Sequence, residues 1–140
     1  MRFVPMKAEH AMMMSNILTL NAGAPLTVEI VVELEEIGGV SAIDDSGNVV
    51  AIAGVMPKWE GSGIAWAWLT RGWFKHARAI TEEVIKGLDA SPLERIEMAV
   101  KIDFDRGHRW AKRLGFELET MAARKWGPDG ATYSIYSRVR

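Results

Sequence analysis

Hydrophobic and polar residues alternate clearly along residues 95–104, "RIEMAVKIDF". Apolar residues stand at every second position from Ile96 to Ile102, so an extended chain here would have one apolar and one polar face. This segment is therefore predicted to be a strand. Two further apolar runs flank the turn-forming residues 44–48, "DDSGN", and predict a β-hairpin. The run "GIAWAWLT", residues 63–70, predicts a third consecutive strand.

Other segments repeat their apolar residues at helical spacing. Residues 74–88 carry one apolar stripe and are predicted to be a helix. Residues 7–18 are rich in helix formers and predict another. Residues 26–39 are ambiguous, because their glutamates and the terminal glycine pair favour a helix while their β-branched residues favour a strand. We interpret them as a helix. Residues 105–116 predict a short helix that ends near Gly115.

The remaining segments complete one domain over residues 1–140, in the order β-α-α-β-β-β-α-β-α-β-β. Residues 1–5 predict a first strand, and two last strands flank the turn at residues 126–130. Residues 19–25, "TLNAGAP", are expected to form a loop. The strand–helix–strand unit between residues 63 and 104 predicts a parallel pair with a right-handed crossover, and short turns make the other pairs antiparallel. The fold class is α+β, with a mixed, mostly antiparallel sheet.

Composition and charge exclude several classes of protein. The chain has 140 residues and a formal net charge of -1, which argues against a polyelectrolyte partner for nucleic acid. It has no cysteine and 3 histidines without ligand spacing, so neither disulfides nor a metal site are expected. No apolar stretch has the length of a membrane span or of a signal-peptide core, so a cytosolic protein is expected.

The endings of these elements resemble the GNAT family of acetyl-CoA-dependent N-acetyltransferases. The resemblance lies in "GNVVAIAGVMP", "WAWLTRGWFKHARAIT", "RWAKRLGFELE" and "WGPDGATYSIYSR", and it covers nearly the whole chain. It is closest to divergent acetyltransferase-like proteins among the structural genes of tailed bacteriophages. It implies helices on both faces of the sheet and a parallel strand pair that splays at a V-shaped gap. It also implies acetyl-CoA as co-substrate, with a small-molecule or protein amine as acceptor.

The resemblance also implies where the coenzyme binds. The gap would lie between residues 68–70 and 103–104, and the pyrophosphate would lie on the helix start at residues 71–77. Arg109, on a strongly basic helix, could contact the 3′-phosphate, although a solvated basic face or a nucleic-acid contact are alternatives. The implied coenzyme-binding residues are Trp68, Leu69, Thr70, Arg71, Gly72, Trp73, Lys75, His76, Ala77 and Arg109.

The sequence departs from the family at its most specific positions. Phe74 and His76 replace the two small residues of the pyrophosphate loop, and only Arg71 matches. Ala111 replaces the usual tyrosine acid, and Phe104 replaces the usual asparagine. The base that deprotonates the amine is open among Glu97, Asp103 and a histidine.

Several side chains allow both a functional and a structural interpretation. Arg71 and Lys75 either bind pyrophosphate or are solvated residues at a helix start. His76 and His108 are acid–base candidates or ordinary surface histidines. Trp66 and Trp68 point the same way and form core or one wall of a groove, whereas Trp73 is expected to be exposed. Met12, Met13 and Met14 fill core or line a groove.

Two hypotheses of different classes follow. The first is an N-acetyltransferase, whose acceptor would enter over residues 19–25 and 126–130. The second is a catalytically silent structural or assembly protein of a phage particle, which the altered loop favours. Nucleic-acid binding ranks third. A homodimer would pair the sheet edge expected at residues 131–139.

Overall fold

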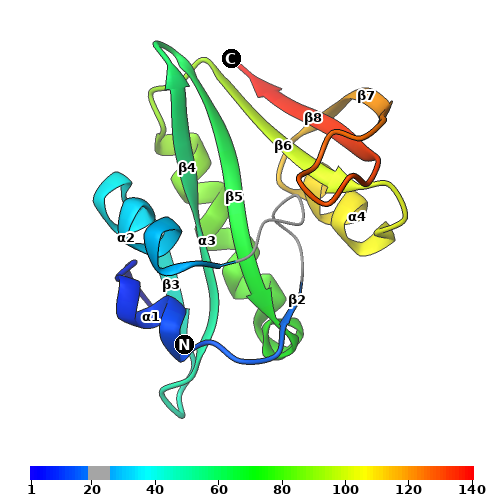
Figure 1. Ribbon diagram of the computed structural model, residues 1–140. Coiled ribbons are helices and arrows are strands. Elements are labelled where there is room, and N and C mark those ends of the chain that lie inside the picture. Colours follow the sequence, from blue (N-terminus) through cyan, green and yellow to red (C-terminus); the bar gives the residue numbers. More distant parts are fainter. Residues whose placement is uncertain (19–25) are drawn as a thin grey trace.

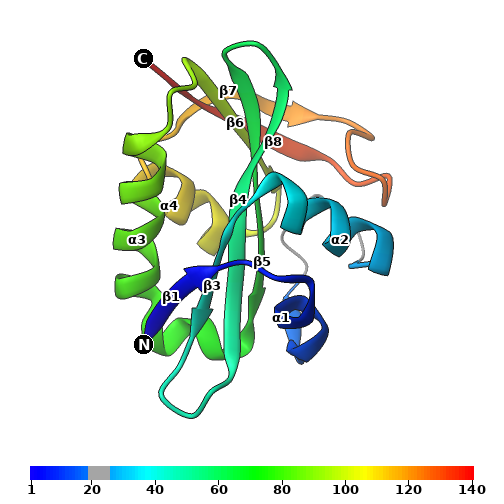
Figure 2. The same cartoon turned by 90° about the vertical axis from the view of Figure 1, so that its left-hand side faces the viewer.

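One mixed sheet, with helices on both faces, forms the protein (Figures 1 and 2). The computed structural model describes residues 1–18 and 26–140, so the loop expected at residues 19–25 lies outside the described residues. The strands are β1 Arg2–Pro5, β2 Ile17–Leu18, β3 Val40–Ile43, β4 Val49–Trp59, β5 Ser62–Thr70, β6 Arg95–Lys101, β7 Glu117–Ala123 and β8 Tyr133–Val139. The helices are α1 Ala8–Met13, α2 Val28–Ile37, α3 Ala77–Ala90 and α4 Asp105–Arg113, with a 3₁₀ helix η1 over Arg71–His76.

The sheet order is β1-β3-β4-β5-β6-β8-β7, and β2 pairs with β5 off this path. Strands β5 and β6 are parallel, and every other described pair is antiparallel, as predicted. The predicted hairpin around residues 44–48 is also confirmed. Its turn is held by Asp44, whose carboxylate accepts hydrogen bonds from the N–H groups of Ser46 and Asn48 at 3.0 and 2.9 Å.

The ambiguous segment 26–39 is a helix, α2. The Thr27 hydroxyl oxygen accepts a hydrogen bond from the Ile30 N–H at 3.2 Å and caps the first turn. Val31 and Leu34 face the core, while the β-branched Val32 lies outside. The buried apolar residues therefore recur at helical spacing, and the Thr27 cap stabilises a helix start, so the segment is a helix despite its β-branched residues.

Two predictions, one about the length of the first helix and one about the edge of the sheet, are wrong. Residues 7–18 do not form one helix, because α1 ends at Met13, Asn16 adopts a left-handed φ of 55°, and Ile17–Leu18 pair with β5. The last strand is not the sheet edge. Strand β8 lies between β6 and β7, because its buried side chains belong in the interior of the sheet and the exposed β7 does not.

The core is divided by the sheet. Trp66 and Trp68, confirmed as core residues, lie under α1 and α2 with their rings 5.7 Å apart. Trp73 was expected to be exposed, but only 6% of it is accessible. It turns inward from η1 and packs against Trp110 of α4, with ring centroids 5.3 Å apart. Of the three methionines at residues 12–14, Met14 is buried, and the other two are exposed.

Candidate functional site

The strands β5 and β6 separate soon after they begin. Their parallel pairing covers only Ser62–Ile64 against Arg95–Glu97. Beyond it the two strands diverge toward their carboxyl ends (Figure 1). Strand β6 stays paired with β8 along its length, so the free edge of residues 98–101 faces β5. The predicted V-shaped gap is therefore present.

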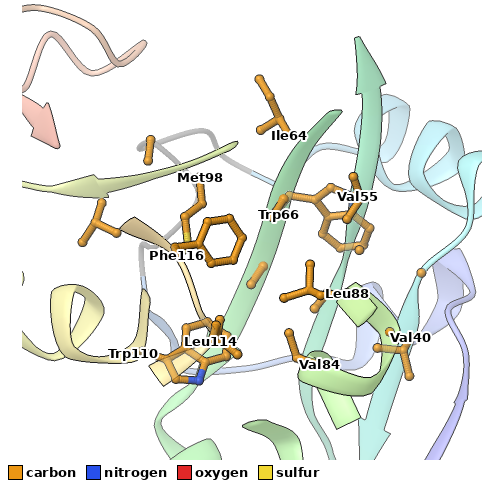
Figure 3. A pocket seen from close by; sticks show the side chains of 18 of the residues that line it. Val40, Val55, Ile64, Trp66, Val84, Leu88, Met98, Trp110, Leu114 and Phe116 are labelled. Carbon is orange, nitrogen blue, oxygen red and sulfur yellow. The ribbon is translucent and has the colours of Figure 1, made fainter. Parts of the chain in front are cut away.

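A cavity of about 390 Å³ occupies this gap and continues beneath α3. Figure 3 shows Val84 and Leu88 of α3, together with Phe116, among the side chains that surround it. Glu83 is the one charged residue among those that line it. The lining residues nearest the two strand edges are Ile64, Ala65, Trp66, Ala67, Met98, Ala99 and Val100.

Main-chain groups along these strand edges give the apolar cavity its hydrogen-bonding capacity. Buried backbone N–H and C=O groups require partners. Residues 65–68 of β5 and 98–101 of β6 have none from a neighbouring strand on the side facing the gap, among the ranges that the structure describes. An extended ligand with amide groups could pair with them as an added strand would.

Strand β2 occupies the outer part of the same edge. Ile17 and Leu18 pair with Thr70 and Leu69, on the side of β5 opposite β4. The Arg71 N–H also donates to the Asn16 carbonyl at 3.1 Å. The main chain of Leu69 and Thr70, implied by the resemblance as an anchor for the coenzyme arm, is thus already paired within the chain. The free β5 edge lies closer to the vertex of the gap.

The expected pyrophosphate loop is η1, which leads directly into α3. The Thr70 hydroxyl donates to the Val50 carbonyl at 2.9 Å, so it does not cap the helical N–H groups. Arg71 and Lys75 are exposed there. Phe74, at the position of a family glycine, packs on Trp73 with ring centroids 5.2 Å apart. The loop therefore keeps cations at a helix start but is closed by aromatic rings.

An acidic turn lies near the far end of this loop. A hydrogen bond from the Asn48 N–H, and to a smaller extent the charge of His76, hold the pKa of Asp44 below its ordinary value. The N-terminal ammonium group, with a smaller contribution from His76, does the same for the pKa of Asp45. Asp44 and Asp45 therefore add negative charge near His76, and this charge opposes the binding of a phosphate there.

Neither carboxylate proposed as a base lines the cavity. Glu97 lies at the vertex of the gap and accepts hydrogen bonds from Lys58 Nζ at 3.2 Å and Arg95 Nε at 3.1 Å. Burial raises its pKa, but the two cations outweigh burial, and the pKa lies below its ordinary value. Asp103 is exposed in the turn between β6 and α4. The structure does not bring these two side chains together.

Helix α4 contributes apolar rather than ionisable groups to the cavity. Ala111 is fully buried, and Phe104 lines the cavity. His108 is held in place: its Nε2 donates to the carbonyls of Lys101 and Ile102 at 3.1 and 3.0 Å, and its Nδ1 shares a hydrogen bond with the Tyr136 hydroxyl at 2.7 Å. Because carbonyls only accept, Nε2 carries a hydrogen. Arg109 is exposed on the outer face of the helix.

Trp110 is a lining residue that sequence reasoning missed. Its Nε1 donates to the Thr81 hydroxyl at 2.9 Å, and this hydroxyl donates to the Ala77 carbonyl at 2.6 Å. The indole thereby ties α4 to the start of α3 across the wide end of the gap. An apolar residue inside a strongly polar helix was the available signal.

Residues 1–18 and 26–140 hold no group of three or more metal-ligating side chains of the His, Cys, Asp and Glu types. Within the same ranges, no helix has the length and apolar character needed to cross a membrane.

Comparison with known proteins finds similarity in structure only. No family model and no curated protein matches the sequence. The ribosomal-protein-S5-alanine acetyltransferase from Vibrio fischeri matches with a TM-score of 0.70 and 15% identity, over 98% of this chain and 91% of that one. A GNAT-family acetyltransferase from Bacillus anthracis matches with a TM-score of 0.70 and 14% identity, over 99% of this chain and 95% of that one.

A third solved structure contains the coenzyme. The GNAT phosphinothricin acetyltransferase from Sinorhizobium meliloti, in complex with AcCoA, matches with a TM-score of 0.63 and 16% identity, over 84% of this chain and 71% of that one. These identities are low, so the matches report on architecture. Together with the parallel pair and its gap, they show that this chain has the fold of the GNAT acetyltransferases.

Proposed function

We propose that the protein is an N-acetyltransferase that moves the acetyl group of acetyl-CoA to a primary amine of a small molecule or protein. The observation that carries this proposal is the gap between β5 and β6, where two strand edges that no other described strand pairs with line an apolar cavity. The AcCoA complex of a protein with the same fold supports the choice of donor.

The residues present suit this coenzyme in part. The edges at residues 65–68 and 98–101 would pair with the amides of its arm. Arg71 and Lys75 would bind its phosphates at the start of η1, with His76 and Arg109 as further cations. The thioester supplies an activated acetyl group for attack by the amine. The amine nitrogen would form a bond to the thioester carbonyl carbon, the carbon–sulfur bond would break, and the coenzyme would leave as its thiolate. That thiolate would take up the proton that the amine loses by way of water, since neither Glu97 nor Asp103 lines the cavity.

Calorimetric titration with acetyl-CoA tests the proposal. We expect a dissociation constant at the micromolar level, about −8 kcal/mol. The double variant Arg71→Ala, Lys75→Ala should weaken binding, because it removes both cations from the helix start. Lys86→Ala, an exposed lysine on α3 away from the loop, is the matched control and should bind normally. Absence of binding at millimolar acetyl-CoA would contradict the proposal.

The pairing of β2 with β5 favours a second candidate. Because this pairing occupies the expected anchor of the coenzyme arm, the fold could serve instead as a catalytically silent structural or assembly protein of a tailed-phage particle. A chain of this kind would bind no acetyl-CoA but would assemble with other particle proteins. Reconstitution with purified particle components, followed by sedimentation, would test that role.

Self-association remains a separate proposal. The described sheet ends in β1 on one side and β7 on the other, and β8 is not an edge. A homodimer that extends the sheet beside the predicted strand would therefore form through β7, which is exposed along most of its length. Sedimentation over a range of protein concentrations would show whether the protein self-associates. Met121→Lys, which places a charge on the exposed β7, should weaken a dimer formed through that strand.

A further inference from the structure

The cavity is larger than the gap between the two strands. From the gap it extends beneath α3 along the face of β4 and reaches Val40 of β3. Neighbouring strands lie about 4.8 Å apart, so the distance from β5 to β3 is roughly 10 Å. We call this extension the α3 branch and define it by Val40, Ala53, Val55, Val84, Gly87 and Leu88.

Small residues create the α3 branch. Ala53 of β4 and Ala65 and Ala67 of β5 face α3, and they leave space beneath the helix that larger core side chains would fill. Gly87 of α3 also lines the branch, but it is exposed, and a Cβ atom added there would meet nothing within 4 Å. Gly87 therefore lies on the open side of the branch.

The walls of the branch are hydrocarbon. Val55, Val84 and Leu88 pack beside it in the core under α3. Glu83 and Ser91 are the polar residues that α3 adds to the lining. The occupant that this chemistry favours is an apolar chain without charge. It is also continuous with the gap, where the thioester of the coenzyme would lie.

We propose that the protein accepts acyl-CoA donors with a linear, saturated acyl chain longer than acetyl, and that this chain lies in the α3 branch. This inference rests on the function proposed above and narrows the class of its donor substrate. Each methylene that moves from water into the branch should tighten binding about fourfold, the roughly 0.8 kcal/mol of one buried methylene.

Titration with acetyl-, butanoyl-, hexanoyl- and octanoyl-CoA tests the proposal. The dissociation constant should fall by about fifteenfold from acetyl to butanoyl, which adds two methylenes, and continue to fall until the branch is full. Two variants test the branch: Ala53→Leu places a side chain inside it, and Gly87→Leu places one at its open side. Each should lower the ratio of the acetyl-CoA to the octanoyl-CoA dissociation constant. Ala90→Leu, an exposed position on the same helix outside the cavity lining, should keep the wild-type ratio.

The outcomes separate this proposal from the proposed function. Equal dissociation constants for all four donors would overturn the longer-chain proposal while acetyl-CoA binding still stands. A dependence on chain length that is unchanged in both Leu variants would place the chain outside the branch and also overturn it. Absence of binding by every donor at millimolar concentration would overturn both. Cooperative unfolding of each variant shows that it is folded, and if one variant fails to fold, the other decides.

Discussion

A methyl group added at Gly54 would collide with the indole ring of Trp66. Gly54 on β4 stands opposite Trp66 on β5. A Cβ atom there would lie 2.5 Å from Cζ2 and 2.8 Å from Cε2 of the ring, closer than real contacts allow. The ring is held against Trp68 and is only 5% accessible, so it has little room to move.

The cost follows from two opposing effects. Overpacking of a filled core destabilises by about 1–3 kcal/mol. Replacing glycine by alanine restricts the unfolded chain and returns about 0.4–1 kcal/mol. We therefore expect Gly54→Ala to lower the free energy of unfolding by about 1–2 kcal/mol. For a chain of this size, the melting temperature should fall by roughly 4 °C for each kcal/mol.

A glycine-to-alanine substitution should instead raise the free energy of unfolding where the added Cβ atom meets open space. Gly87 lies inside α3, where a Cβ atom meets nothing within 4 Å. Glycine in a helix interior costs about 1 kcal/mol relative to alanine, so Gly87→Ala should stabilise the protein by up to that amount. Urea unfolding followed by far-ultraviolet circular dichroism measures both variants under one set of conditions.

A double-mutant cycle identifies the cause of the loss at Gly54. In a Trp66→Leu background, the added methyl group no longer meets an indole, so Gly54→Ala should lose most of its cost. The reasoning is refuted if Gly54→Ala is neutral or stabilising. It is equally refuted if the substitution costs the same with Trp66 and with Leu at position 66.

Three further predictions concern charge and pH. Asp45→Asn removes a carboxylate near His76 and should tighten binding of acetyl-CoA by less than about tenfold at low salt, with the gain lost at high salt. An unchanged affinity would place the turn at residues 44–48 away from the ligand. The lowered pKa of Glu97 stabilises the fold at pH values above its ordinary pKa near 4.3, and this stabilisation is lost as the pH falls through the folded pKa. Glu97→Gln should therefore lose less stability than the native protein between neutral and acid pH. Curves of unfolding free energy against pH that run parallel for the two proteins would contradict the ion pair. Burial raises the pKa of both tyrosines in the chain, that of Tyr133 to about 12, so absorbance should show little tyrosine ionisation at pH 10 in the folded protein but half-ionisation near pH 10 in urea. The stability that this shift contributes is lost as the pH rises from about 10 toward the folded pKa values. Tyrosine ionisation near pH 10 in the native protein would disprove the burial effect.

Local patterns were sufficient for most elements of the fold. The alternation along residues 95–104 and the turn residues 44–48 specify structure through neighbours in the sequence. The hairpin is confirmed, and the strand is confirmed over Arg95–Lys101, with residues 102–104 in the turn that follows. The parallel pair followed from chain connectivity, because a crossover helix separates its strands. The V-shaped gap came from the resemblance, and the splay of β5 and β6 confirms it.

Contacts distant in the sequence explain what was missed. The two residues of β2 are extended because β5 offers them hydrogen bonds, which no local propensity reports. Trp73 is buried because η1 turns it toward Trp110. The cavity was missed for a related reason: Ala53 leaves space only because the fold places α3 over that face of the sheet.

The position of β2 determines how a coenzyme arm could lie. Along the gap side of β5, the strand β6 takes residues 62–64 and β2 takes residues 69–70, and none of the strands in residues 1–18 and 26–140 pairs with residues 65–68 on that side. Four residues of strand span about 13 Å. A ligand paired there cannot also pair with the main chain next to the expected phosphate site at Arg71, because β2 lies between them. The cations of η1 and the strand edges of the cavity must therefore contact a ligand independently. Loss of the glycine loop would then weaken the hold on the phosphates without closing the cavity, which is how this fold could retain a binding site while its most specific motif is absent.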